Sequence, residues 1–384
     1  MTGRSQRSYW SALALTGMLT LTLGLALASP ATADNEEKFY QQHNLVSDVP
    51  GLADHTDPNL VNAWGMSFSS TSPFWVSDNG TGVSTLYNGA GQSFPVASPL
   101  VVTIPLPPGS TEPHSKPTGQ VFNGTSDFQV ASGLPSVFIF ATEDGTIAGW
   151  NPFVPVFLST TAILKVDNSG SGAIYKGLET ANIGPHNFLY AANFHAGTID
   201  VFDKNFNPVP LPPGAFSDPN LPAGYAPFNI QNLGGQLYVA YAKQDADKED
   251  EVAGQGKGFV DVFNSNGVLV QRVATRGKLN APWGLALAPP NFGRFSNDVL
   301  VGNFGDGRIS AYRLKNNRFQ FHGQLNTPDG KRVEIDGLWA LSFGKGGANN
   351  GPTNVLFFTA GPDDEDHGLF GSLTACSKST CGNP

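Results

Sequence analysis

The chain has 384 residues, of which 45 are glycine and 29 are proline, and its formal net charge is −9. Glycine and proline at this density leave few stretches long enough for a helix, which excludes a helical protein. The negative charge argues against nucleic acid and anionic membranes as partners.

The first 33 residues predict an export signal. Arg4 and Arg7 precede an apolar stretch of residues 10–28, and residues 31–33 (Ala-Thr-Ala) form a small-x-small cleavage site. We expect cleavage near Ala33, a secreted or periplasmic mature chain, and no stable membrane insertion afterwards. Because the stretch approaches spanning length, an uncleaved anchor is the alternative. Without the two arginines, 20 Lys and Arg face 31 Asp and Glu, a net charge of about −11.

Six segments share one pattern: an apolar β-run, a turn rich in Asp, Asn and Gly, and a second β-run ending in an aromatic and a polar residue. The spacing is about 50 to 60 residues, which is typical of repeat architectures. A further β-run, Phe39–Ser47, precedes the first segment. The six segments are residues 74–88, 137–151, 189–203, 237–264, 299–313 and 355–373.

A shorter glycine-containing strand lies upstream of these pairs, most clearly at 62–68, 281–287 and 336–343. Each unit therefore has an inner strand, two middle strands and an outer strand, the composition of a propeller blade. We predict an all-β, six-bladed propeller in one domain (39–375), with Phe39–Ser47 completing the last blade beside residues 368–373. A string of sandwich domains and a parallel β-helix are the alternatives, and the sandwich would not produce a two-strand period of 50 residues.

The fourth unit contains an acidic insertion, residues 245–251 (DADKEDE), followed by VAGQGKG. Asp250 stands where an EF-hand needs glycine, and Gly256 stands where its bidentate Glu belongs, so an EF-hand is rejected. A flexible lid over one end of the ring and a solvated surface loop both remain open.

Cys376 and Cys381 are the two cysteines of the chain, and both lie in the tail 376–384. In an oxidising compartment we expect them to form a disulfide. A zinc site would need more ligands than this spacing supplies.

The repeat motifs WVSDNGTGVSTLY, YAANFHAGTIDVFD and VGNFGDGRISAY resemble NHL-type propellers. Over essentially the whole mature chain, stretches such as APWGLALAP, IDGLWALSFG and FFTAGPDDEDHGLFG resemble a family of exported bacterial proteins of undetermined function. Some members of that family carry a sorting tail of the PEP-CTERM kind. The resemblance implies the propeller fold but no activity, and the ending CSKSTCGNP implies no such anchoring.

The hairpin turns of a propeller converge on one face of the central channel. Their oxygen ligands could hold Ca²⁺, although hairpin turns need Asp, Asn and Gly in any case. The candidate metal ligands are Asp78, Glu143, Asp144, Asn193, His195, Asn303, Asp306, Asp363 and Asp364.

Three tryptophans recur at equivalent inner-strand positions, where they either stack on a flat ligand or pack between blades. The candidate ligand-binding residues are Asn62, Trp64, Trp283, Trp339 and Asp336, with Glu179, Asn229 and Asn280 near the channel mouth. A zinc site of His186, His195 and His367 is a weaker alternative, because no metal-binding spacing supports it.

The catalytic residues, if any, are unknown at this stage. A nucleotide or flavin cofactor is not expected, because the corresponding fingerprints are missing from the sequence. Three functions stay open: a propeller that binds a small molecule, glycan or protein through its channel face, stabilised by a cation; a metal-dependent hydrolase or lyase of the lactonase-like class; and a structural matrix protein.

Overall fold

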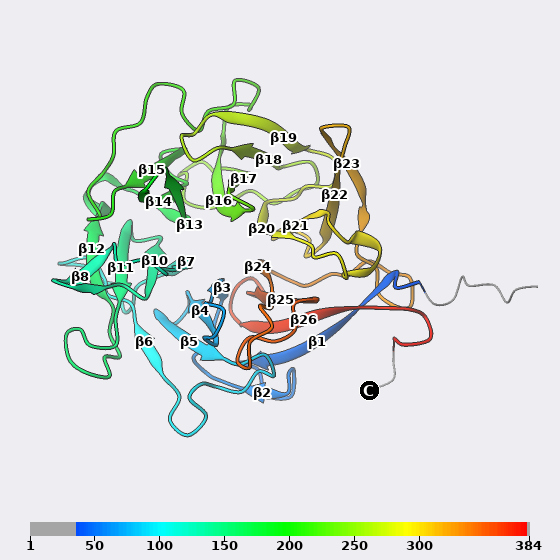
Figure 1. The fold of residues 1–384 in the computed structure, drawn as a ribbon, viewed down its shortest axis with the longest axis horizontal. Helices are drawn as coiled ribbons and strands as arrows, with labels where there is room; N and C mark the ends of the chain where they lie inside the picture. The colour runs from blue at the N-terminus through cyan, green and yellow to red at the C-terminus, as the bar shows by residue number, and fades with distance from the viewer. Residues whose placement is uncertain (1–35, 382–384) are drawn as a thin grey trace, which may run out of the picture. The chain divides into compact units, whose positions relative to one another are not determined.

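Figure 1 shows a computed structural model, in which residues 36–381 are described. The expected export signal, residues 1–33, lies outside the described residues. Between residues 36 and 381, no helix is long and apolar enough to cross a bilayer.

Six sheets of the described residues are the blades of the predicted propeller, and they are antiparallel except for the parallel pair β1 and β2. The first blade is β3 (Ala63–Ser67), β4 (Phe74–Asp78), β5 (Val83–Tyr87) and β6 (Val101–Thr103). The second is β7 (Pro117–Phe122), β10 (Phe138–Thr142), β11 (Thr146–Trp150) and β12 (Ile163–Asp167), with a small hairpin of β8 (Gln129–Ala131) and β9 (Leu134–Pro135). The third is β13 (Tyr175–Ile183), β14 (His186–Asn193) and β15 (Thr198–Phe202).

The other three blades follow in chain order. The fourth is β16 (Tyr225–Leu233), β17 (Gln236–Lys243), β18 (Phe259–Phe263) and β19 (Leu269–Thr275). The fifth is β20 (Pro282–Leu287), β21 (Val299–Asn303), β22 (Ile309–Lys315) and β23 (Arg318–Gln324). The sixth joins β24 (Leu338–Phe343), β25 (Val355–Ala360) and β26 (Leu369–Cys376) to β1 (Phe39–Ser47) and β2 (His55–Thr56). Two short 3-10 turns, Ser169–Ser171 and Gly293–Phe295, lie in connections.

The inner strands β3, β7, β13, β16, β20 and β24 form a closed ring, in which each strand contacts its two neighbours. Aromatic side chains fill the spaces between blades; Trp75, for example, stacks on Phe138 of the next blade with ring centroids 4.1 Å apart. Full burial of such a side chain contributes about 1.5–3 kcal/mol, so the faces of each blade are stable only between neighbours.

The chain ends close the ring as predicted. Strand β1 pairs with β26 in antiparallel register from Phe39 opposite Cys376 to Ser47 opposite Leu369. The Tyr40 hydroxyl also donates to the Phe292 carbonyl (3.2 Å), which attaches the closing strand to the fifth blade. The predicted disulfide between Cys376 and Cys381 is present directly after β26.

The prediction of four strands in every blade is wrong for the third blade, where β15 is followed by no fourth strand in the described chain. The connection after β15 makes only a short contact with it, through the Val209 amide to the Val201 carbonyl (2.8 Å). It then contains a run of prolines, which cannot donate to a strand ladder. These are Pro208, Pro210, Pro212, Pro213, Pro219 and Pro222.

Candidate functional site

Every inner strand has a β-bulge at the same level of the ring. In β13, for instance, Tyr175 and Gly177 pair with the adjacent residues Asn193 and Ala192, so that Lys176 is the extra residue. A bulge of this kind redirects a side chain, and here it does so in all six blades at once. The residues at the bulges are Trp64, Thr118, Lys176, Phe228, Trp283 and Trp339.

Small residues let the inner strands approach each other at this level. A Cβ atom on Gly119 would lie 2.4 Å from the Leu178 amide nitrogen of the next inner strand, and one on Gly177 would lie 2.7 Å from the Asn229 Cα. Because such separations are shorter than a carbon contact allows, glycine is required at these two positions.

Aromatic rings fill the middle of the channel. Trp64 and Trp339 stack with centroids 3.7 Å apart, and Phe304 stacks on Trp339 at 4.1 Å. The Trp339 indole donates to Asn62 Oδ1 (2.9 Å), and the Trp283 indole donates to the Lys176 carbonyl (3.2 Å). All three predicted tryptophans are therefore buried and packed, and in this structure their faces are covered by other residues. Ligand stacking on them stays a prediction.

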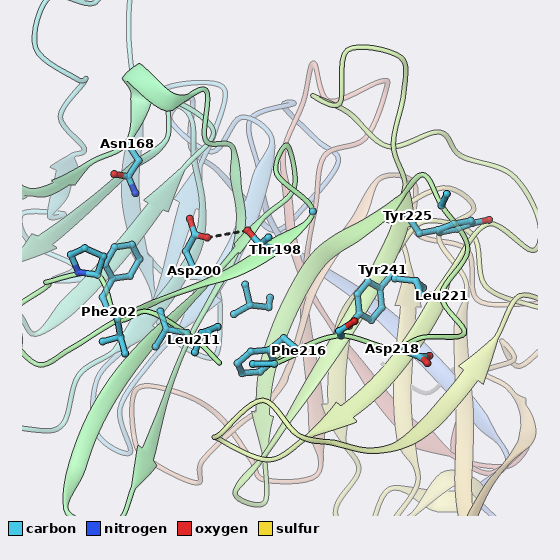
Figure 2. Close-up of a pocket in the computed structure, with 18 of the residues that line it drawn as sticks. Asn168, Thr198, Asp200, Phe202, Leu211, Phe216, Asp218, Leu221, Tyr225 and Tyr241 are labelled. Carbon is cyan, nitrogen blue, oxygen red and sulfur yellow. Dashed lines mark hydrogen bonds between the residues drawn. The ribbon is translucent and has the colours of Figure 1, made fainter. Parts of the chain in front are cut away.

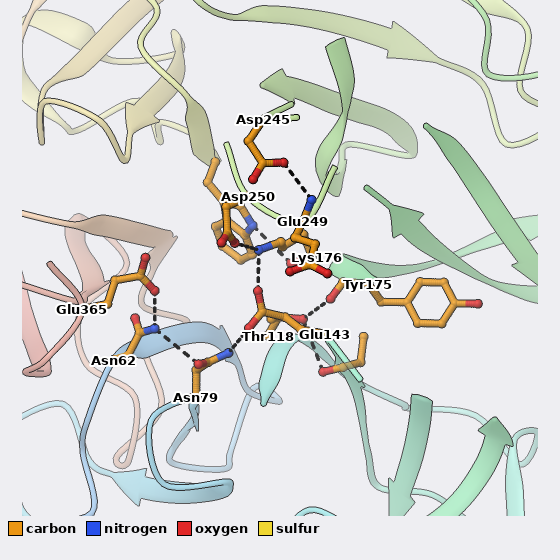
Figure 3. Close-up of polar contacts among 12 residues, drawn as sticks. Asn62, Asn79, Thr118, Glu143, Tyr175, Lys176, Asp245, Glu249, Asp250 and Glu365 are labelled. Carbon is orange, nitrogen blue, oxygen red and sulfur yellow. Dashed lines mark hydrogen bonds and ion pairs between the residues drawn. The ribbon is translucent and has the colours of Figure 1, made fainter. Parts of the chain in front are cut away.

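Lys176 is the one charged residue among the six at the bulges, and its side chain is fully buried. Its ammonium forms ion pairs with Glu143 and with Asp250 Oδ1 (3.0 Å), which come from the turn between β10 and β11 and from the acidic insertion (Figure 3). It also lies 5.1 Å from the centroid of the Trp64 ring, a cation–π distance.

A pocket of about 470 Å³ opens where the inner strands begin, and it is markedly acidic. Turns of several blades contribute to it, so the predicted convergence of hairpin turns on one face occurs in the structure. It is lined by Asn62, Asn79, Gly80, Lys116, Glu143, Asp144, Ile174, Glu249, Asp250, Asp364, Glu365 and Asp366.

A chain of amides connects the carboxylates of this pocket (Figure 3). Asn79 Nδ2 donates to Glu143 Oε2 (2.9 Å), and Asn62 Nδ2 donates to Glu365 Oε2 (2.5 Å) and to Asn79 Oδ1 (3.4 Å). The first, second and sixth blades are thereby linked around the pocket.

Burial and the neighbouring carboxylates together shift the pKa values of the charged groups at the acidic end. Burial alone would lower the pKa of Lys176, but Glu143, Glu251 and Asp250 outweigh it and raise that pKa above its ordinary value. Burial, with the neighbouring charge of Glu143, raises the pKa of Glu365 to about 7. Burial likewise raises the pKa of Glu251 to about 8, against the opposing effect of Lys176. One ammonium does not neutralise this set of carboxylates.

The opposite end of the inner strands forms a second, less charged pocket of about 510 Å³. Glu179 of β13 accepts hydrogen bonds there from the Thr180 amide (2.7 Å), the Asn232 amide (2.9 Å) and Gln231 Nε2 (3.0 Å). Burial raises its pKa to about 7, and the nearby Lys345 partly opposes this shift.

Of the residues predicted from sequence, Asn62, Glu143, Asp144 and Asp364 line the acidic pocket, and Glu179 lines the opposite one. The others do not line the acidic pocket. Asn193 binds Asp200 (3.0 Å), Asn303 binds Asp306 (2.9 Å), and Asp336 accepts from the Asp363 amide (2.9 Å). Asn193 and Asn303 thereby stabilise their own turns, which was the alternative interpretation for the candidate metal ligands, whereas Asp336 connects two loops of the sixth blade.

Three further predicted residues have distinct surroundings. Asp78 is fully buried, and burial raises its pKa well above the ordinary value. His195 is only partly buried, and His367 pairs with Asp48 (2.8 Å) instead of with another histidine. Among the residues that the structure describes, no three His, Cys, Asp or Glu side chains are grouped so that they could hold a metal ion.

Sequence reasoning missed Lys176. The signal was present, because YKG at 175–177 occupies the position of AWG at 63–65 and PWG at 282–284. A lysine at a position where other repeats have tryptophan therefore indicates a charged side chain at the centre of the ring.

No protein-family model matches the chain. Uncharacterized protein R648 of Acanthamoeba polyphaga mimivirus is 34% identical over 336 residues, which cover 86% of this chain and 78% of the viral protein. Uncharacterized protein L690 of the same virus is 35% identical over 336 residues, which cover 86% of this chain and 84% of the viral protein. The chain belongs to the family of these viral proteins. Their names state no activity, and these relatives lend no support to the expected bacterial family.

Solved structures also align with this chain. The streptogramin B lyase structure has a TM-score of 0.47 and 12% identity, covering 88% of this chain and 97% of its own. The soluble aldose sugar dehydrogenase of Escherichia coli has a TM-score of 0.49 and 12% identity, covering 88% and 99%. The calcium-binding protein regucalcin of Agrobacterium tumefaciens has a TM-score of 0.48 and 10% identity, covering 83% and 92%. Likeness at this level says nothing about chemistry.

Proposed function

We propose that the acidic pocket binds an organic cation that carries primary ammonium groups. The observation that carries the proposal is the surplus of carboxylates around the buried Lys176 ammonium, which already binds two of them in ion pairs. Seven carboxylates line the pocket beside a single lysine, Lys116: Glu143, Asp144, Glu249, Asp250, Asp364, Glu365 and Asp366. Such a rim attracts cations and raises their local concentration.

The raised pKa of Glu365 gives the site a pH dependence. A cation bound beside Glu365 stabilises its ionised form, lowers its pKa and releases a proton near neutral pH. Ammonium groups suit the pocket because carboxylate and amide oxygens accept their hydrogen bonds. Calcium, which the sequence favours as a stabilising ion, is the competing occupant of the same oxygens.

Calorimetric titration of the purified protein with spermidine tests the proposal. We expect one-site binding that weakens below pH 7 and releases protons, measured in two buffers of different ionisation enthalpy. Glu365→Gln removes one carboxylate with little change of shape and should weaken binding about tenfold. Glu334→Gln is the matched control, because Glu334 is exposed, pairs with Arg308 and does not line the acidic pocket.

Equal binding by the two variants would contradict the proposal, as would the lack of any spermidine binding. A parallel titration with CaCl₂ separates the two occupants. Calcium binding that Glu365→Gln abolishes, without any response to spermidine, would replace the ammonium proposal with the calcium site predicted from sequence.

We also propose that the protein is exported. The basic residues, apolar stretch and small-x-small site of residues 1–33 support this proposal. The Cys376–Cys381 disulfide supports it independently, since disulfides persist mainly in oxidising compartments. Amino-terminal sequencing of the protein recovered outside the producing cell tests it, with Asp34 as the expected first residue; recovery of the intact chain inside the cell would contradict it.

A further inference from the structure

A third cavity lies between the third and fourth blades, away from the channel residues described above. Its volume is about 670 Å³, within the range of small-molecule sites. It lies beside β15, where the third blade has no fourth strand, and the proline-containing connection 203–224 forms its outer side. The cavity is therefore a consequence of the interrupted blade.

The walls of this inter-blade cavity are mostly aliphatic and aromatic (Figure 2). Strand β15 contributes two apolar side chains on the face toward the fourth blade, and the connection and the first two strands of the fourth blade contribute the rest. These residues are Ile199, Val201, Val209, Leu211, Phe216, Leu221, Tyr225 and Tyr241. Such walls favour a ligand with an aromatic or branched apolar body.

Tyr241 supplies the polar feature that points to a ligand. Its side chain is 1% exposed and lines the cavity, and its hydroxyl has no hydrogen-bond partner among the described residues. Figure 2 shows this hydroxyl directed toward the side of the cavity where Phe216 lies. Burial, followed by the charge of Asp261, raises the pKa of Tyr241 well above its ordinary value, so the group stays an O–H donor. A buried donor without an acceptor is costly, and a ligand oxygen would satisfy it.

The two carboxylates of the cavity are already satisfied. Asp200 accepts from Tyr175 (3.0 Å), Asn193 (3.0 Å) and Thr198 (3.0 Å). Asp218 forms an ion pair with Arg272, which also binds Asp261. These groups leave no cation free for an anionic ligand, and the aspartates would repel one.

We propose that the inter-blade cavity binds a neutral small molecule with an aromatic body and one acceptor oxygen, which accepts a hydrogen bond from the Tyr241 hydroxyl. The aromatic body packs against Phe216 and Tyr225, and the oxygen lies at Tyr241. This site is independent of the channel and of the cation proposed there.

Three naphthalene probes test the inference by equilibrium dialysis against the purified protein. We expect 2-acetonaphthone to bind about fivefold more tightly than 2-isopropenylnaphthalene, which has nearly the same shape but a CH2 group in place of the acceptor oxygen. Anionic 2-naphthoate should bind more weakly than both. In Tyr241→Phe the fivefold preference should disappear, while the fold is retained because the lost hydroxyl has no partner to leave behind.

Leu211→Trp is the blocking variant, because Leu211 is partly buried in the cavity wall and a larger ring would fill the space. It should abolish binding of the ketone, whereas Leu314→Trp, at a position 53% exposed on β22, should not. Equal affinity of the ketone and the hydrocarbon in the wild type would overturn the inference. A preference that survives in Tyr241→Phe, or ketone binding that survives in Leu211→Trp, would overturn it as well.

Discussion

The two ends of the channel differ in how they hold charge, although one strand supplies both central residues. Strand β13 contributes Lys176 at the acidic end and Glu179 at the opposite end. Lys176 is held by carboxylates from distant loops, whereas Glu179 is held largely by amide groups of its own strand and of the adjacent inner strand.

The partners of Lys176 and of Glu179 come from different parts of the fold. The groups that hold Glu179 lie on inner strands of the rigid ring: the backbone amides of Thr180 and Asn232, and the side-chain amide of Gln231. The carboxylates around Lys176 come from a hairpin turn and an insertion that can be changed without changing the blades. The acidic end is therefore the one whose chemistry can vary within the fold, which is typical of loops on a rigid scaffold.

The largest expected effect comes from Lys176→Met, which breaks the acidic end. The substitution leaves Glu143 and its neighbours close together without their buried cation, and we expect a loss of about 3 kcal/mol in the free energy of unfolding at pH 8. The loss should be smaller at pH 5, where these carboxylates take up protons. Urea denaturation at both pH values measures it.

Lys331→Met is the control for this substitution, because the Lys331 side chain is 82% exposed and its loss should change stability little. An equally small effect of Lys176→Met would show that the axial ammonium does not hold the acidic end together.

A smaller effect is expected from pH itself. Glu365 and Glu251 have folded-state pKa values of about 7 and about 8, above those of an unfolded chain. Their contribution to stability is therefore complete below about pH 4.5 and is lost as pH rises through 7 to 8. Between pH 5 and 8, Glu365→Gln should reduce this loss in the free energy of unfolding by about 1–2 kcal/mol, a value that allows for the partial exposure of the group. Thermal or urea unfolding from pH 5 to 8 measures the slope, with Glu334→Gln as control; a slope unchanged by Glu365→Gln would contradict the assignment.

The smallest effect should come from Glu179→Gln at the other end. The amide keeps the shape and most hydrogen bonds, so we expect a loss of about 1 kcal/mol at pH 5. Because the wild-type pKa is about 7, the wild type loses stability above neutral pH while the variant does not. The difference between them should therefore shrink by pH 8. A cost that grows with pH would show that charged Glu179 is stabilised by Lys345 more than burial disfavours it.

Repeat spacing and turn chemistry were sufficient to predict most of the fold, including closure by Phe39–Ser47. The pairing of Cys376 with Cys381 was predicted separately, from the expected oxidising compartment. Repeat spacing and turn chemistry were insufficient at the third blade, where the segment pattern continued but the proline-containing connection 203–224 forms no fourth strand. The candidate site was predicted in part. Glu143 and Asp364 follow from the turn rule, whereas Asn193 and Asn303 obey the same rule and stabilise their own turns instead.

By itself the sequence determined the blade count, the closing strand and the face on which the turns converge, because these follow from local strand and turn preferences repeated along the chain. Only the tertiary structure placed Lys176 between Glu143 and Asp250, which are 33 and 74 residues away. It also left the Tyr241 hydroxyl without a partner in a cavity. Both features depend on which side chains of different blades meet. The bulges and the packing between sheets decide this, and neither can be read from a single repeat.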